Sequence, residues 1–98
     1  MTVLFRDEAL EDLDEIARFI ARDNPMVANW IIARIHEVIY DTLDAFPESG
    51  RRADSAAYEF AVPHLPYLIV YLPQKAGIDV IGVFHTARDP HSKYNRRT

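Results

Sequence analysis

Leu65-Pro66-Tyr67-Leu68-Ile69-Val70-Tyr71 decides the fold of this chain, together with the apolar run 78–84 that follows it. Residues 67–72 are nearly all apolar or aromatic, which is typical of a central strand. Residues 73–77, Pro-Gln-Lys-Ala-Gly, have the composition of a hairpin loop. Val80-Ile81 in the second run indicates burial on both faces of that strand. We therefore predict a central strand joined by a hairpin to the last strand of the chain.

Three weaker patterns surround this hairpin. Residues 58–62 alternate with the period of a half-buried strand, and Pro63 should end it because proline has no N–H to donate. Phe46-Pro47-Glu48-Ser49-Gly50-Arg51 is a break in the pattern, with Pro and Gly at turn positions. Val3–Phe5 is a short apolar run and predicts a first strand. One strand is therefore expected at the start of the chain and three at its end.

Two segments between the first strand and the break have helical periodicity. Asp7 is expected to cap the first helix, and Asp12 is placed away from its apolar stripe. The stripe consists of five residues: Leu10, Leu13, Ile16, Ala17 and Ile20. Asn24 is expected to cap the second helix, with Pro25 at its first position, and this helix should run to about Ala45.

These elements predict an α+β fold in a single domain over residues 1–98, with an N-terminal strand and a helical hairpin packed on a small antiparallel sheet. The 98 residues are 49% apolar, enough for a modest core. The sequence has no cysteine, no signal-peptide pattern at its start and no run of the roughly 20 apolar residues that a membrane span needs. We therefore expect a cytoplasmic protein without membrane contacts.

Charge and histidine placement narrow the functional classes. The net charge of −4 divides into −7 for residues 1–49 and +3 for residues 50–98. Such a chain can offer one face to a basic partner and another to an acidic partner, although a solvated helix and an ordinary charged tail explain the division as well. The histidines lack the i, i+4 spacing of zinc ligands, and no glycine-rich phosphate loop is present. We expect no metal and no cofactor.

Three aromatic residues lie off the apolar stripes of the predicted helices. They are Phe19 on the first helix and Trp30 and Tyr40 on the second. An aromatic side chain outside the stripe either packs against a neighbouring element or contacts a partner. Packing within the chain is the commoner outcome, but the sequence leaves both interpretations open for all three residues.

His85-Thr86-Ala87-Arg88-Asp89-Pro90, directly after the last strand, is the one place where chemistry or tight recognition is expected. As a ribonuclease site, His85 would be an acid or base, Arg88 would bind the phosphodiester, and Tyr94 would stack on a base or donate a proton. We favour a structural alternative. In it, Arg88 and Asp89 form an ion pair at the end of the strand, and His85 caps the sheet with a backbone hydrogen bond.

Five motifs together resemble the RelE/ParE superfamily of toxins from type II toxin–antitoxin systems, and the ParE-type toxins in particular. The resemblance spans about residues 3–90, and its motifs are Ala9-Leu-x-Asp-Leu-x-x-Ile-Ala-x-Phe-Ile20, Asp23-Asn24-Pro25, Phe46-Pro47-x-x-Gly50-Arg51, the stretch 65–71 and Val83-Phe84-His85-Thr86-Ala87-Arg88-Asp89. Each motif alone is ordinary, whereas their order and spacing are specific. The resemblance implies a helical hairpin against a small, strongly twisted antiparallel sheet.

The resemblance also implies a toxin that inhibits DNA gyrase and is neutralised by a cognate ParD-like antitoxin. Such an antitoxin is expected to have a ribbon-helix-helix part, so that operator DNA is contacted only through it. Arg51, His85 and Arg88 match family motif positions and are the candidates for target binding. A wrapping antitoxin segment would cover Phe19, Trp30 and Tyr40.

Two other activities stay open within the superfamily. The ribonuclease branch cuts mRNA on the ribosome, and His85, Arg88 and Tyr94 would then be catalytic. We favour gyrase inhibition because ribosome-directed nucleases tend to be strongly basic, whereas this chain has a net charge of −4. A third possibility is a member that has lost its toxicity and only binds an antitoxin or acts as a co-repressor.

Overall fold

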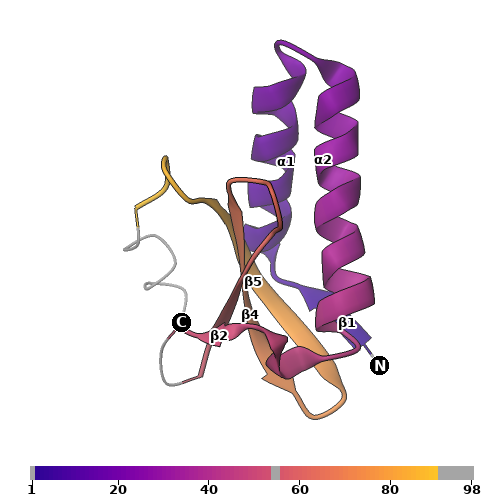
Figure 1. Ribbon diagram of the computed structural model, residues 1–98, viewed down its shortest axis with the longest axis vertical. Coiled ribbons are helices and arrows are strands. Elements are labelled where there is room, and N and C mark those ends of the chain that lie inside the picture. Colours follow the sequence, from indigo (N-terminus) through magenta and orange to yellow (C-terminus); the bar gives the residue numbers. More distant parts are fainter. Residues whose placement is uncertain (1, 54–55, 91–98) are drawn as a thin grey trace.

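A computed structural model of the chain describes residues 2–53 and 56–90 (Figure 1). The elements follow the predicted order of strand, two helices and strands: β1 (Thr2–Phe5), α1 (Asp7–Ala21), α2 (Pro25–Glu37), a π-helix (Val38–Leu43), a short 3-10 helix (Pro47–Ser49), β2 (Arg51–Arg52), β3 (Tyr58–Ala61), β4 (Tyr67–Gln74) and β5 (Gly77–His85). The α+β class is therefore confirmed. No helix within the described ranges is long and apolar enough to span a bilayer.

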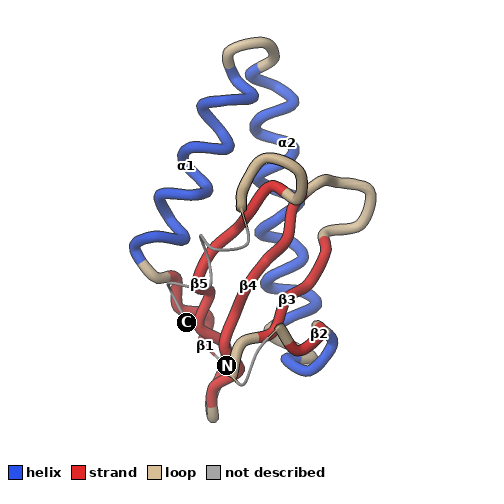
Figure 2. Tube along the Cα trace, turned by 90° about the vertical axis from the view of Figure 1, so that its left-hand side faces the viewer, coloured by secondary structure: helices blue, strands red, loops and turns tan. Residues whose placement is uncertain are grey.

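The five strands form one sheet in the order β1-β5-β4-β3-β2, and the helical hairpin covers one face of it (Figure 2). Strands β3 to β5 are antiparallel, as predicted. The two-residue strand β2, which the sequence did not predict, pairs antiparallel with β3, so four strands rather than three follow the helices. β1 pairs with β5 in parallel, from Thr2 opposite Gly77 to Phe5 opposite Val80. The sheet is thus mixed. Since residues 6–76 lie between β1 and β5, no tight turn forces these two strands to be antiparallel.

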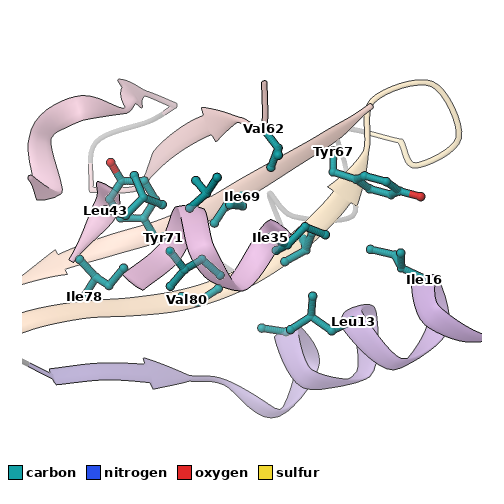
Figure 3. Packing of buried hydrophobic residues seen from close by; sticks show 14 residues of the cluster. Leu13, Ile16, Ile35, Leu43, Val62, Tyr67, Ile69, Tyr71, Ile78 and Val80 are labelled. Carbon is teal, nitrogen blue, oxygen red and sulfur yellow. The ribbon is translucent and has the colours of Figure 1, made fainter. Parts of the chain in front are cut away.

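The main core lies between the helices and the sheet (Figure 3). Leu13 and Ile16 of α1 and Ile35 of α2 meet the inward side chains of β4 and β5, among them Ile69 and Val80. A second, smaller cluster lies on the opposite face of the sheet and consists of Ala57, Val70, Ile81 and Phe84. The prediction that β5 is buried on both faces is confirmed.

A β-bulge in β5 changes which face of the sheet its side chains point to. Tyr71 is opposite Val80, but Val70 is opposite Gly82, so Ile81 is an extra residue in β5. An extra residue reverses the alternation of side chains beyond it. Val83 therefore packs in the same cluster as Val80, although the two are three positions apart in the chain.

Local details of the helices partly match the sequence patterns. The Asn24 cap is confirmed, since its Oδ1 accepts from the N–H of Val27 at 3.2 Å. The Asp7 cap is wrong, because Arg6 occupies the cap position and Asp7 is the first residue of α1. There its charge still favours the positive end of the helix dipole. Leu10, placed in the apolar stripe, is 50% exposed.

Two boundaries also differ from the predictions. The second helix is α-helical only to Glu37 and continues as the π-helix to Leu43, where it was expected to run uniformly to about Ala45. The loop predicted over 73–77 is shorter, because β4 extends to Gln74 and β5 begins at Gly77. Pro73 fits into the strand next to Ile78, its partner in register.

Candidate functional site

The loop after β5 is held by hydrogen bonds that its own side chains make to its backbone. The N–H of His85 donates to Asp89 Oδ2 at 2.7 Å. His85 Nδ1 in turn accepts from the N–H groups of Ala87 and Arg88, at 3.1 and 3.0 Å. The imidazole therefore caps the turn, as the structural alternative predicts. The strand end is fixed by a carboxylate–backbone hydrogen bond, whereas the sequence predicts an ion pair between Arg88 and Asp89.

These contacts determine the protonation of His85. A nitrogen that accepts two N–H groups carries no proton, so the hydrogen bonds assign a neutral ring with its proton on Nε2. Burial lowers the pKa of His85, and the nearby Arg88 guanidinium lowers it further, while Asp89 opposes both. The ring also lies edge-on against Tyr67, with 5.4 Å between ring centroids.

Arg88 lies on an aromatic ring of the first helix. Its Cζ is 4.0 Å from the ring centroid of Phe19, while Arg22 Cζ lies 5.9 Å from the same centroid. The Arg88 guanidinium also affects Tyr67 of β4. Burial raises the pKa of Tyr67, and the charge of Arg88 and its side-chain hydrogen bond oppose that rise. The guanidinium thus interacts both with α1 and with the sheet.

A groove of about 170 Å³ lies beside this contact, between α1 and the end of β5. Asp12, Glu15, Ile16, Phe19, Val83, Arg88 and Asp89 line it. Asp12 is only 4% exposed, and its Oδ2 accepts from the N–H of Val83 at 3.1 Å. Sequence reasoning placed Asp12 off the buried face, which is wrong. The helical spacing of Ala9 with Leu13 and Ile16 would have located it on that face.

Arg51 occupies a different surface from Arg88. It forms an ion pair with Glu59 of β3, whose side chain is 6% exposed while that of Arg51 is 82% exposed. A second hollow, of about 190 Å³, is lined by Arg51, Glu59, Leu68, Phe84, His85, Thr86, Asp89 and Pro90. The three candidates for target binding therefore do not form one site. Arg51 and His85 share this hollow, and Arg88 lines the groove beside α1.

The turn that carries Arg51 is held by a buried tyrosine. The hydroxyl of Tyr71 donates to the carbonyl oxygen of Pro47 at 2.7 Å and accepts from the N–H of Gly50 at 3.0 Å. A Cβ at Gly50 would lie 2.4 Å from this hydroxyl oxygen, so glycine is required there for space. Phe46, at the start of the turn, is 68% exposed.

All three aromatic residues that lie off the helical stripes are exposed: Phe19 at 50%, Trp30 at 59% and Tyr40 at 48%. Each lies on a different element, and their surroundings differ. Phe19 contacts Arg88, while Tyr40 stacks on His36 at 6.4 Å between centroids and lies 6.3 Å from Phe5. Met26, one helical turn before Trp30, is 82% exposed and was not singled out in the sequence.

The remaining candidates concern Tyr94 and metal ligands. Tyr94 lies outside the described residues, so the catalytic set predicted for a ribonuclease is represented by His85 and Arg88. Within residues 2–53 and 56–90, no group of three His, Asp or Glu side chains comes together in a way that could hold a metal ion.

Comparison with known proteins agrees with this fold. The family model described as "ParE toxin of type II toxin-antitoxin system, parDE" matches residues 3–90. The chain is 33% identical over 78 residues to a protein of Sinorhizobium fredii (strain NBRC 101917 / NGR234) named "Putative toxin Y4kP", a match that covers 79% of each chain. A chain of a solved structure, "Chromosomal ParDE TA system from P. aeruginosa", superposes with a TM-score of 0.74 at 17% identity, over 87% of this chain and 95% of that one. This chain therefore belongs to the ParE toxin family of type II toxin–antitoxin systems.

Proposed function

We propose that this ParE-family chain inhibits DNA gyrase and is neutralised by a cognate ParD-type antitoxin. The observation that carries the choice of gyrase is the state of His85. Its Nδ1 is filled by two backbone N–H groups, which makes this histidine a structural cap of the loop that presents Arg88. The polar segment 85–89, which is part of the resemblance to the toxins, thus uses its side chains to fix the loop that carries Arg88.

The same geometry argues against the ribonuclease alternative. Cleavage through a ribose 2′-hydroxyl needs one group to accept a proton and another to donate one. His85 has only Nε2 left for such a transfer, and burial raises the pKa of its neighbour Tyr67 above the usual tyrosine value, which makes Tyr67 a poor proton donor near neutral pH. The net charge of −4 also disfavours a ribosome as the target, because attraction to RNA phosphates requires positive charge.

The antitoxin part of the proposal is supported by exposed apolar side chains on the helical hairpin. Phe19, Met26 and Trp30 are each at least half exposed, although each belongs to a helix with a well-buried opposite face. Such side chains are the usual anchors of a partner segment laid across a protein surface. Operator DNA would then be reached only through the antitoxin, in the cytoplasm.

A supercoiling assay with purified gyrase tests the proposal. Purified toxin should stop supercoiling or cause cleaved DNA to accumulate, and prior addition of the antitoxin encoded beside the toxin gene should abolish the effect. Arg88→Ala should weaken the inhibition, and Arg52→Ala is the matched control, since Arg52 also lies over an aromatic ring, that of Tyr58, at 5.8 Å. Cleavage of mRNA in a translating extract while supercoiling continues would establish the ribonuclease activity instead.

A further inference from the structure

Asp12 is a buried carboxylate to which the proposed function assigns no role. It lies on the buried face of α1 with Ala9, Leu13 and Ile16, and only 4% of its surface is exposed. Burying a carboxylate is costly unless hydrogen bonds replace its lost hydration, so its presence in a small core needs an explanation. Its Oδ2 accepts from the backbone N–H of Val83, 71 positions later in the chain, at 3.1 Å.

This hydrogen bond lies at the point where β5 leaves its neighbouring strand. β1 pairs with β5 only as far as Val80. Beyond the bulge, the N–H of Val83 is bound by Asp12 of α1 instead. Two positions later, His85 ends the strand and begins the loop that carries Arg88. A helix therefore holds β5 directly before this loop.

The same face of α1 meets the end of β5 a second time. Phe19 follows Asp12 by seven positions, which places both side chains on one face of the helix, two turns and about 10 Å apart. Cζ of Arg88 lies 4.0 Å from the centroid of the Phe19 ring. Ile16 lies between the two positions, and all four side chains line the groove between α1 and β5. The helix is thus attached to the end of β5 at two points.

The charges of this groove attract Arg88 toward α1. Among the described residues that line it, Asp12, Glu15 and Asp89 are acidic and Arg88 is basic. Asp89 also accepts from the N–H of His85 at 2.7 Å. Attraction between charges acts from many directions, so it favours a guanidinium in the groove without selecting the ring of Phe19 as its place.

The place of the guanidinium depends on where α1 lies along β5. The hydrophobic effect is non-directional, so apolar packing specifies the position of a helix less sharply than a hydrogen bond does. The bond between Asp12 and Val83 joins one side-chain oxygen to one backbone N–H. A shift of α1 by one helical turn, about 5.4 Å, would break this bond and remove Phe19 from Arg88.

We propose that Asp12 is a positioning residue for target binding: its hydrogen bond to Val83 fixes α1 along β5 and so holds Phe19 against Arg88. Asp12 itself is too buried to meet the target. The inference rests on the proposed function, since it takes Arg88 as a contact of gyrase. It adds the residue that keeps this contact in place.

The first experiment follows the Arg88 side chain by NMR in the purified full-length toxin. An aromatic ring shifts the signals of protons that lie over its face, and comparison with Arg88→Ala assigns them. In Asp12→Ala these signals should move toward those of an exposed arginine. In Asp12→Asn, which keeps an uncharged and weaker acceptor, they should move part of the way. Asp14→Ala removes an exposed carboxylate from the same helix and should leave them unchanged.

The second experiment measures inhibition of gyrase supercoiling at a temperature at which every variant is folded. Asp12→Ala should need about tenfold more toxin for half-inhibition, the factor that corresponds to the loss of one hydrogen bond. Asp12→Asn should lie between this variant and the wild type. Val38→Ala is the control for stability, because it leaves a cavity in the main core on the π-helix. It should inhibit as the wild type does.

Several outcomes would overturn the inference. One is a folded Asp12→Ala with unchanged Arg88 signals, and another is equal movement of these signals in Val38→Ala, since lost stability alone would then explain the effect. Should Asp12→Ala fail to fold, unchanged Arg88 signals in Asp12→Asn would overturn it as well. Wild-type inhibition by an Asp12 variant whose Arg88 signals have moved would show that gyrase does not depend on this position.

Failure of the proposed function has a different result. Wild-type toxin that does not inhibit gyrase would refute that function, whereas the Arg88 signals of the Asp12 variants would still decide whether Asp12 positions Arg88.

Discussion

Two tyrosines of β4 hold two arginine-bearing loops in different ways. Tyr71, in the middle of the strand, is completely buried, and its hydroxyl both donates and accepts within the turn that leads to Arg51. Tyr67, at the start of the strand, packs edge-on against His85 in the loop that carries Arg88, which lies on an exposed ring. Both loops are fixed by hydrogen bonds. The polar groups of the first turn are satisfied by the buried Tyr71, whereas the second loop presents Arg88 on a ring that is half exposed.

This difference separates a structural loop from a recognition loop. Arg51 is compensated within the chain by the buried carboxylate of Glu59, so its removal should affect folding first. Arg88 lies over a neutral ring that is half exposed, so its removal should affect binding first. A change that damages the support of both loops at once should have the largest effect.

Ile69→Ala should cost about 2–5 kcal/mol of unfolding free energy, because Ile69 is fully buried midway between the two tyrosines. Chemical denaturation of the purified variant measures the cost. Val27→Ala on the exposed part of α2 is the control and should have little effect. A loss below 1 kcal/mol would mean that β4 is not the common support of the two loops.

Tyr71→Phe should cost about 1–3 kcal/mol, since the Gly50 N–H and the Pro47 carbonyl lose their shared partner in a part-buried turn. Tyr40→Phe, which removes a hydroxyl from a half-exposed side chain, should be nearly neutral. Equilibrium unfolding of both variants gives the comparison. Equal costs for the two would show that the Tyr71 hydroxyl does not hold the turn.

Arg51→Ala and Arg88→Ala compare the two loops most directly, because one should reduce stability and the other toxicity. Arg51→Ala should cost about 1–2 kcal/mol, because the buried Glu59 carboxylate loses a charged hydrogen-bond donor. Arg88→Ala should cost less than about 1 kcal/mol, since it removes only contacts at an exposed site, yet it should abolish most of the toxicity on expression. Toxic Arg88→Ala protein of normal stability would remove Arg88 from the recognition surface.

The smallest effect concerns pH. The pKa of His85 is lower in the folded chain than in the unfolded one, so the unfolded chain binds a proton first as the pH falls. Stability should therefore be undiminished above the ordinary histidine pKa of about 6.5 and should fall as the pH drops below it, levelling off below the folded pKa. His85→Asn keeps an acceptor near Nδ1 but does not titrate. Thermal unfolding between pH 7.5 and 5 should show a smaller loss for His85→Asn than for the wild type, and parallel curves would contradict the assignment.

Local patterns were enough for most of the fold. The apolar runs of β4 and β5, the Asn24-Pro25 start of α2 and the end of β3 before Pro63 were all predicted, because each depends on residues close together in the chain. Helical periodicity placed Phe19, Trp30 and Tyr40 off the apolar stripes but left open whether they pack within the chain, and the structure shows all three exposed. The boundaries of the hairpin turn and the change to a π-helix were missed, since they depend on packing against the sheet.

The sequence by itself determined the elements, their order and the residues that carry the family resemblance, because periodicity and backbone chemistry act over a few residues. Only the tertiary structure decided that β1 runs parallel to β5, that Asp12 is buried against Val83 and that Phe19 supports Arg88. Each of these contacts joins residues about 70 positions apart. Their geometry depends on how the helical hairpin docks on a bulged sheet, and no short-range pattern encodes that docking.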